Sequence, residues 1–113
     1  MSSTLPIFLW AAKASLENLP RFAPGQIVST PGALALLAEH QTDPGELLRR
    51  HLAGDWGDAL CSEDQGLNDA ALTNGSRLLS AYRVGPDVLW IITEAEDEQG
   101  ERSATTLLLP GEY

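Results

Sequence analysis

Apolar residues recur every three or four positions over roughly the first two thirds of the chain and then alternate with polar ones. The first spacing is typical of helices that cover a core, and the second is typical of strands. We therefore expect helices first and strands afterwards. The predicted helices span residues 5–19, 31–41, 44–52 and 62–74, with the first lying ahead of the prolines at positions 20 and 24.

Helix starts are well marked. Thr30 before Pro31 and Asp43 before Pro44 each combine a capping side chain with proline at the first helical position. Ser62 with Gln65 suggests a capping box for the next helix. The helical spacing predicts buried faces made of Leu34, Leu37 and Ala38, then Leu47, Leu48, His51 and Leu52, and finally Leu67, Ala70 and Ala71.

Three strands are expected after residue 76, at 77–84, 88–94 and 102–109, joined by short turns at 85–87 and 98–100. The chain is therefore expected to be α+β, with three helices packed on a C-terminal antiparallel β-meander and an extra N-terminal helix. A short fourth strand at Gln26–Ser29 could add an edge. Residues 1–21 are predicted to form a helical extension, and residues 22–113 a single domain.

Composition narrows the class of protein. A chain of 113 residues that is 43% hydrophobic can form one domain with its own core, and this composition disfavours intrinsic disorder. No apolar run reaches the ~18 residues of a membrane span, so we expect no membrane partner. Cys61 is the single cysteine, which excludes an internal disulfide, and no basic residue precedes the apolar stretch 5–12 as in a signal peptide. These features indicate a cytoplasmic protein.

Charge is distributed unevenly. The chain carries 16 acidic and 7 basic residues, for a formal charge of −9. Residues 1–54 hold four of each sign, so the whole excess lies in residues 55–113. Direct binding of nucleic acid is disfavoured, because it needs a basic surface. We expect a basic protein partner instead, while the alternative is that acidity only keeps the protein dissolved.

The segment GDWGD at 54–58 is the most unusual in the chain. Trp56 could anchor a protein contact. Asp55 and Asp58 could instead bind a cation together with His51, Glu63 or Asp64, although the spacing fits neither calcium-loop nor zinc patterns. We favour a third interpretation, in which this is an ordered loop with Trp56 in the core and its aspartates capping backbone amides.

A second acidic run lies at the expected turn between the last two strands, and it contains Glu94, Glu96, Asp97 and Glu98, followed by Glu101. Such a run is usually a solvated turn, but it could also mimic phosphate charge in a site built for nucleic acid. If the third core helix lies beside the sheet, the acidic surface around this turn would also include Asp55, Asp58, Glu63, Asp64 and Asp69.

Catalysis is not expected. His40 and His51 are the two histidines, both in predicted helices, and a histidine on an apolar face is more often a core residue than a general base. Cys61 precedes a helix start, where a thiol pKa can fall, but no nearby base is evident. Motifs for nucleotide, zinc or redox chemistry do not occur. We therefore expect no enzyme, no cofactor and no metal.

Several segments together resemble a family of small bacterial proteins labelled plasmid-related, which occur on plasmids and integrative elements. They are FAPGQIVSTPGA at 22–33, GDWGD at 54–58, LLSAY at 78–82, WIITEA at 90–95 and TTLLLPGEY at 105–113. The resemblance covers residues 22–113 and implies a mobile-element origin, without known catalytic residues. Residues 1–20 and the acidic tip at 97–101 look like additions to the common pattern.

The main functional hypothesis follows from the acidity and from this resemblance. It is a non-catalytic interaction or inhibitor protein, of the anti-restriction or anti-CRISPR kind, that occupies the basic nucleic-acid site of a defence complex. The expected contact residues are Asp55, Trp56, Asp58, Glu63, Asp64, Glu94, Glu96, Asp97 and Glu98. The alternative is a small-ligand or metal-binding accessory module that uses the loop 55–58. A monomer and a homodimer both fit the sequence.

Overall fold

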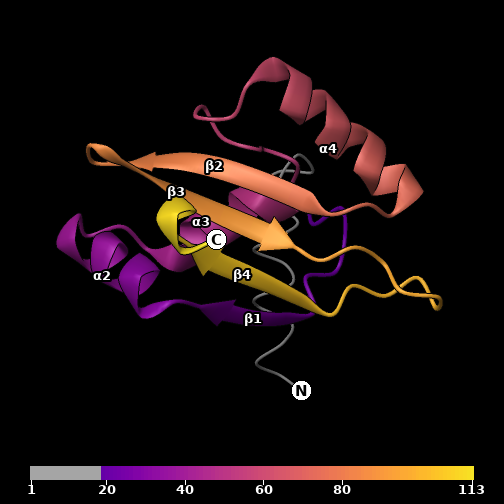
Figure 1. Ribbon diagram of the computed structural model, residues 1–113, viewed down its shortest axis with the longest axis horizontal. Helices are drawn as coiled ribbons and strands as arrows, with labels where there is room; N and C mark the ends of the chain where they lie inside the picture. The colour runs from indigo at the N-terminus through magenta and orange to yellow at the C-terminus, as the bar shows by residue number, and fades with distance from the viewer. Residues whose placement is uncertain (1–18) are drawn as a thin grey trace.

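Three helices and four strands form an α+β fold in the computed structural model, which describes residues 19–113 (Figure 1). The expected fold class is confirmed. The elements are β1 (Gln26–Ser29), α2 (Pro31–Glu39), α3 (Pro44–Leu52), α4 (Ser62–Asn74), β2 (Leu78–Val84), β3 (Asp87–Thr93), β4 (Ala104–Leu108) and a final 3-10 turn, η2 (Pro110–Glu112).

The four strands form one mixed sheet in the order β1-β4-β3-β2. β2, β3 and β4 are successive antiparallel neighbours, as the predicted meander requires. β1 pairs with β4 in parallel, from Gln26 opposite Ala104 to Ser29 opposite Leu107. The expectation of a purely antiparallel sheet is therefore corrected. No tight turn fixes the direction of β1, because three helices and two strands separate it from its partner in sequence.

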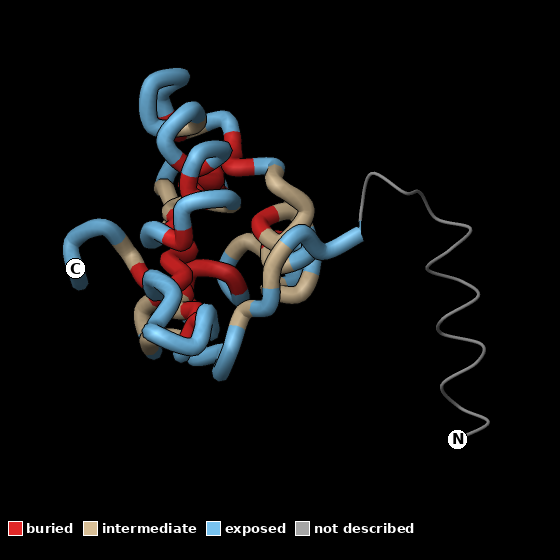
Figure 2. Tube along the Cα trace, turned by 90° about the vertical axis from the view of Figure 1, so that its right-hand side faces the viewer, coloured by how far each residue is buried: buried red, intermediate tan, exposed pale blue. Residues whose placement is uncertain are grey.

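The main core lies between one face of the sheet and the helices α2 and α3. Figure 1 shows α3 behind the sheet and the C-terminal turn in front of it, and Figure 2 shows the buried segments running through the middle of the fold. Alternate residues of the strands face α2 and α3, as the period of two demands. This core contains Leu37, Leu47, Tyr82, Leu89 and Ile91.

The outer edge of β2 is covered by α4 and by the loop before it. Asn68 donates from its side-chain amide to the Leu79 carbonyl (2.6 Å) and accepts from the Leu79 N–H (3.1 Å). The loop bonds the same edge, since Ala81 donates to the Trp56 carbonyl (2.9 Å) and Ala59 donates to that of Ala81 (3.2 Å). These contacts satisfy strand groups that would otherwise be open to another chain.

Four residues that the helical spacing predicts to be buried are exposed in the structure. Leu67 is 64% exposed and Leu34 is 49% exposed, while Ala38 and Ala70 also face solvent. The N-cap of α4 is Cys61, with no side-chain hydrogen bond, so the capping box predicted at Ser62 is wrong. α4 packs at the edge of the sheet and not over its face, so only a narrow stripe of the helix is buried.

The predicted N-terminal helix and most of the predicted extension 1–21 lie outside the described residues. Arg21, which the structure does describe, is attached to the domain, because its backbone N–H donates to the carbonyl of Leu52 at 2.8 Å. In residues 19–113 no helix has the length and apolar character needed to cross a bilayer.

Candidate functional site

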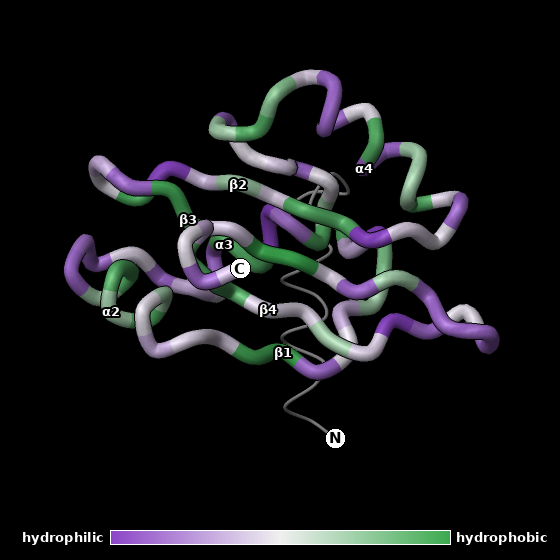
Figure 3. The backbone as a smooth tube through the Cα atoms, viewed as in Figure 1, coloured by the Kyte–Doolittle hydropathy of each residue, from purple (hydrophilic) through white to green (hydrophobic). Residues whose placement is uncertain are grey.

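An acidic hairpin at residues 94–103 connects β3 to β4 and projects from one end of the sheet, where Figure 3 shows its polar tip. The Asp97 carboxylate accepts hydrogen bonds from the backbone N–H groups of Gln99 (2.8 Å) and Glu101 (2.9 Å). Gly100, with a φ of 78°, donates its N–H to the Asp97 carbonyl at 3.0 Å. Hydrogen bonds within the turn therefore define its backbone conformation.

Arg102 fastens the base of the hairpin to the end of α4. Its guanidinium is buried, with the residue 7% exposed, and it donates to the carbonyls of Ser76 (2.7 Å), Glu94 (3.0 Å) and Ala71 (3.1 Å). The Glu96 carboxylate lies 3.8 Å from the same guanidinium. A planar group with several fixed donors is suited to joining three carbonyls from different segments.

Sequence reasoning missed Arg102, because it was counted only as one basic residue among many acids. A single arginine inside an acidic run is the one signal that could have drawn attention to it. Its role becomes evident only once α4 is known to end beside the hairpin.

Three carboxylates of the hairpin point into solvent. Glu94, Glu98 and Glu101 are exposed, and among residues 19–113 they form no ion pair. The charge of Glu96 is partly neutralised by Arg102, and the Asp97 carboxylate accepts a hydrogen bond from the backbone of its own turn. The hairpin therefore presents a locally uncompensated negative charge on an ordered backbone.

The remaining predicted acidic residues form a second group, around the loop before α4. Asp55 accepts from the Arg50 guanidinium at 2.7 Å, and this hydrogen bond lowers the pKa of the Asp55 carboxyl below its usual value. Asp58 is exposed in the same loop. Glu63 and Asp64 are exposed in the first turn of α4, where carboxylates favour the positive end of the helix dipole. Asp55, Glu63 and Asp64 therefore have local structural explanations, whereas Asp58 makes no side-chain hydrogen bond or ion pair among the described residues.

The two acidic groups lie at opposite ends of α4. Glu63 and Asp64 belong to its first turn, whereas Glu96 donates its N–H to the carbonyl of Gly75, immediately after the last turn, at 2.8 Å. A helix of 13 residues is about 20 Å long. The structure therefore does not bring the predicted acidic residues together into one compact cluster.

Trp56 is not a surface anchor. It is 4% exposed, and its indole Nε1 donates to Asp69 at 2.9 Å, while its ring packs near those of Phe22 and His51. Asp55 accepts from the Gly57 N–H at 3.2 Å, as a loop-capping aspartate does. The burial of Trp56 argues against the predicted contact role. The loop packs Trp56 into the core and Asp55 caps a backbone amide, as the ordered-loop interpretation expects, but the Asp58 side chain makes no such hydrogen bond among the described residues.

His51 lies at the centre of a buried polar chain. Its Nδ1 is 2.5 Å from the Ser80 hydroxyl and its Nε2 is 2.8 Å from that of Thr93. The chain continues from Thr93 to the Thr105 hydroxyl (2.7 Å), which donates to the Pro24 carbonyl (2.8 Å). Burial, aided by the charge of Arg102, lowers the His51 pKa to about 3. Ser80 and His51 are both 0% exposed, so this histidine–serine pair is part of the buried core and has no contact with solvent.

Metal binding by the loop 55–58 gains no support from the geometry. Across the described part of the chain, no group of three histidine, cysteine, aspartate or glutamate side chains could hold a metal ion. Cys61 is exposed as a free thiol at the start of α4.

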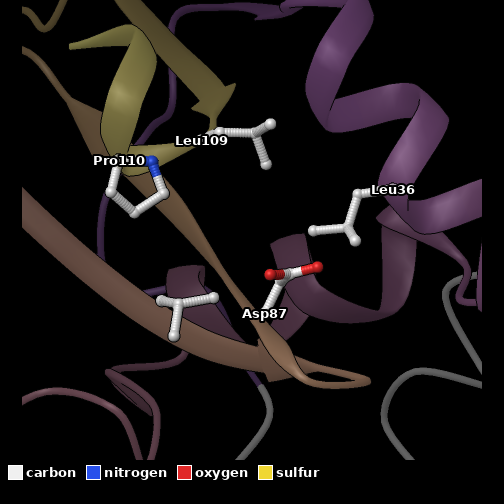
Figure 4. Close-up of a pocket in the computed structure, with 5 residues that line it drawn as sticks. Leu36, Asp87, Leu109 and Pro110 are labelled. Atoms are coloured by element: carbon white, nitrogen blue, oxygen red, sulfur yellow. The ribbon is translucent and has the colours of Figure 1, made fainter.

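A shallow pocket of about 280 Å³ lies between α2, the start of β3 and the C-terminal turn (Figure 4). It is lined by Leu36, Asp87, Val88, Leu109 and Pro110, so one exposed carboxylate faces apolar walls. The pocket offers no second polar side chain that would orient a small ligand.

Comparison with protein-family models, curated proteins and solved structures finds no match to this chain.

Proposed function

We propose that this protein is a non-catalytic interaction protein that binds a basic protein partner through the hairpin 94–103. One observation carries the proposal. Glu94, Glu98 and Glu101 are exposed without a compensating base, on a turn that the buried Arg102 holds in place. Because the backbone of the turn is already ordered, only the glutamate side chains lose conformational freedom on binding, so more of their electrostatic attraction is retained as affinity than on a flexible loop.

The partner class proposed here is a nucleic-acid-processing defence complex with a basic binding site. Carboxylates at the hairpin would occupy positions that phosphates take in the natural ligand. The formal charge of −9 would steer such a partner toward the chain. The resemblance to proteins of plasmids and integrative elements supports an anti-restriction or anti-CRISPR role in the bacterial cytoplasm, since mobile elements benefit from blocking host defence.

Capture experiments with the full chain test this proposal. The wild type and the triple variant Glu94→Gln, Glu98→Gln, Glu101→Gln are immobilised and exposed to bacterial lysate at low and high salt. The three substitutions preserve side-chain size and leave Asp97 and Arg102, which order the hairpin, untouched.

A second triple variant serves as the matched control, because it removes three carboxylates at the other end of α4. It carries Asp58→Asn, Glu63→Gln and Asp64→Asn. We expect the wild type and the control to retain a nucleic-acid-processing protein at low salt, and the hairpin variant to lose it. Equal retention by the hairpin variant, or a partner lost only by the control, would overturn the assignment of the hairpin.

A further inference from the structure

The pocket at the start of β3 combines one carboxylate with apolar walls. Its volume is about 280 Å³, and its lining consists of Leu36, Asp87, Val88, Leu109 and Pro110. Figure 4 shows the Asp87 carboxylate among these apolar side chains. In residues 19–113 this carboxylate forms no ion pair, so its negative charge at the pocket is not compensated by a base.

The walls of the pocket are held in place by the fold. Leu36 belongs to the main core and is 7% exposed. Leu109 caps the C-terminal turn, which starts at Pro110. In this turn the Glu112 carboxylate accepts hydrogen bonds from the Thr30 hydroxyl (2.7 Å) and the Leu109 N–H (2.8 Å). Thr30 is the N-cap of α2, so these bonds fix the turn to the helix that supplies Leu36, and a ligand meets a pocket that is already formed.

This lining favours a long apolar chain that ends in one positive charge. Cavities for drug-sized ligands usually measure about 300–1,000 Å³, so the pocket suits a smaller occupant. A lysine side chain lays its methylene groups along apolar surface and carries a single compact charge at its end. Arginine fits less well, because its planar guanidinium has five donors and the lining side chains offer one carboxylate to accept them.

We propose that this pocket binds a lysine side chain presented by a protein partner. The ammonium group pairs with Asp87, and the methylene groups lie against Leu36, Leu109 and Pro110. The formal charge of −9 steers a basic protein toward the chain, so a lysine-bearing surface is the occupant that the charge favours.

The pocket is a second contact site, separate from the acidic hairpin. Asp87 is the first residue of β3 and Glu94 follows its last, so seven residues of extended strand place them roughly 23 Å apart. The test of the pocket uses small lysine analogues and needs no captured partner. Either proposal can therefore fail without the other.

An NMR titration of the full chain, labelled at its leucine and valine methyl groups, tests the pocket. The probe is Nα-acetyl-lysine methylamide, and the neutral comparison is the norleucine analogue, which has the same stem without the ammonium. Ionic strength is matched with sodium chloride. We expect the lysine analogue to shift the methyl signals of Leu36, Val88 and Leu109, with a dissociation constant in the millimolar range, because one exposed ion pair and a short stem contribute little affinity.

The variant Asp87→Asn removes the charge from the pocket and preserves side-chain size. Asp58→Asn is the matched control, because it removes one exposed carboxylate elsewhere and leaves the same net charge. Asp87→Asn should bind the lysine analogue about fivefold more weakly, the most that one exposed ion pair contributes. Asp58→Asn should bind it like the wild type.

The comparison of the two analogues on the wild type needs no variant, so it decides the matter even if Asp87→Asn folds poorly. Equal binding of the lysine and norleucine analogues, equal weakening in both variants, or no shift at the pocket methyl groups would overturn the proposal. n-Butylammonium provides a further arm, because it lacks the peptide groups of a lysine in a protein. Tighter binding of n-butylammonium than of the lysine analogue would assign the pocket to a free amine and contradict a protein partner.

Discussion

Mild acid should destabilise this protein through His51. The ring is fully buried between the hydroxyls of Ser80 and Thr93, and desolvation, followed by the charge of Arg102, lowers its pKa from 6.5 to about 3. The unfolded chain binds a proton at this histidine near pH 6.5, but the folded protein does not. Stability is therefore complete above pH 6.5 and is lost as the pH falls from there toward 3.

The size of the effect follows from the difference between the two pKa values. Each pH unit between 6.5 and 3 removes about 1.4 kcal/mol from the free energy of unfolding. At pH 4.5 the loss from His51 alone is therefore about 3 kcal/mol, a large fraction of the 5–15 kcal/mol typical of a small domain.

Urea denaturation at half-unit steps from pH 7 to pH 4.5 measures this loss. In His51→Gln, a neutral side chain that can still bond the two hydroxyls, the slope against pH should become shallower by about 1.4 kcal/mol per unit. The variant can also be less stable at pH 7, so slopes are compared and not absolute values. An NMR titration in which the His51 ring of the wild type protonates near pH 6.5 would refute the reasoning.

Three substitutions test the contacts that position the hairpin and cover β2, each by its thermal midpoint and by urea denaturation. Arg102→Lys should cost about 2–4 kcal/mol, because a single ammonium cannot reach all the carbonyls that the guanidinium joins; an unchanged midpoint would mean that these bonds contribute nothing. Gly57→Ala should cost more than about 2 kcal/mol, since Gly57 has a φ of 95° and a Cβ there would overlap the carbonyl oxygen of Ala81. Asn68→Leu should cost about 1–3 kcal/mol by leaving the Leu79 N–H and C=O at the edge of β2 without partners; a more stable variant would show that packing outweighs these bonds.

Local signals in the sequence predicted most of the secondary structure. Thr30 with Pro31 and Asp43 with Pro44 mark α2 and α3 as expected, and in both cases the capping side chain accepts a backbone N–H. The sequence also predicts the short strand β1. Such signals act between neighbours in sequence, so they can be read without knowledge of the tertiary fold.

Features set by distant residues were not predictable in the same way. The parallel pairing of β1 with β4 joins residues about 80 positions apart, and no turn chemistry encodes it. The helical spacing predicts Leu67 in the core, yet α4 packs at the edge of the sheet and leaves this side chain exposed. The helical period predicts which face of a helix is apolar, but it does not predict how much of that face is buried.

The candidate site illustrates the same limit. The acidic hairpin was evident from composition, because five carboxylates lie close together in sequence. That Arg102 is buried beneath it, and that Asp55 is paired with Arg50, depends on the relative placement of α4, β2 and the loop. Trp56 was identified as unusual, but tryptophan suits both a core and an interface, and only the fold distinguishes them.

Affinity of the captured partner as a function of salt tests the central claim most directly. Isothermal titration with the wild type should show binding that weakens steadily as salt rises. The variant Glu94→Gln, Glu98→Gln, Glu101→Gln should bind about tenfold more weakly at low salt, with a shallower salt dependence, since each exposed ion pair contributes up to about 1 kcal/mol. An affinity and a salt slope equal to those of the wild type would contradict the hairpin as the binding surface.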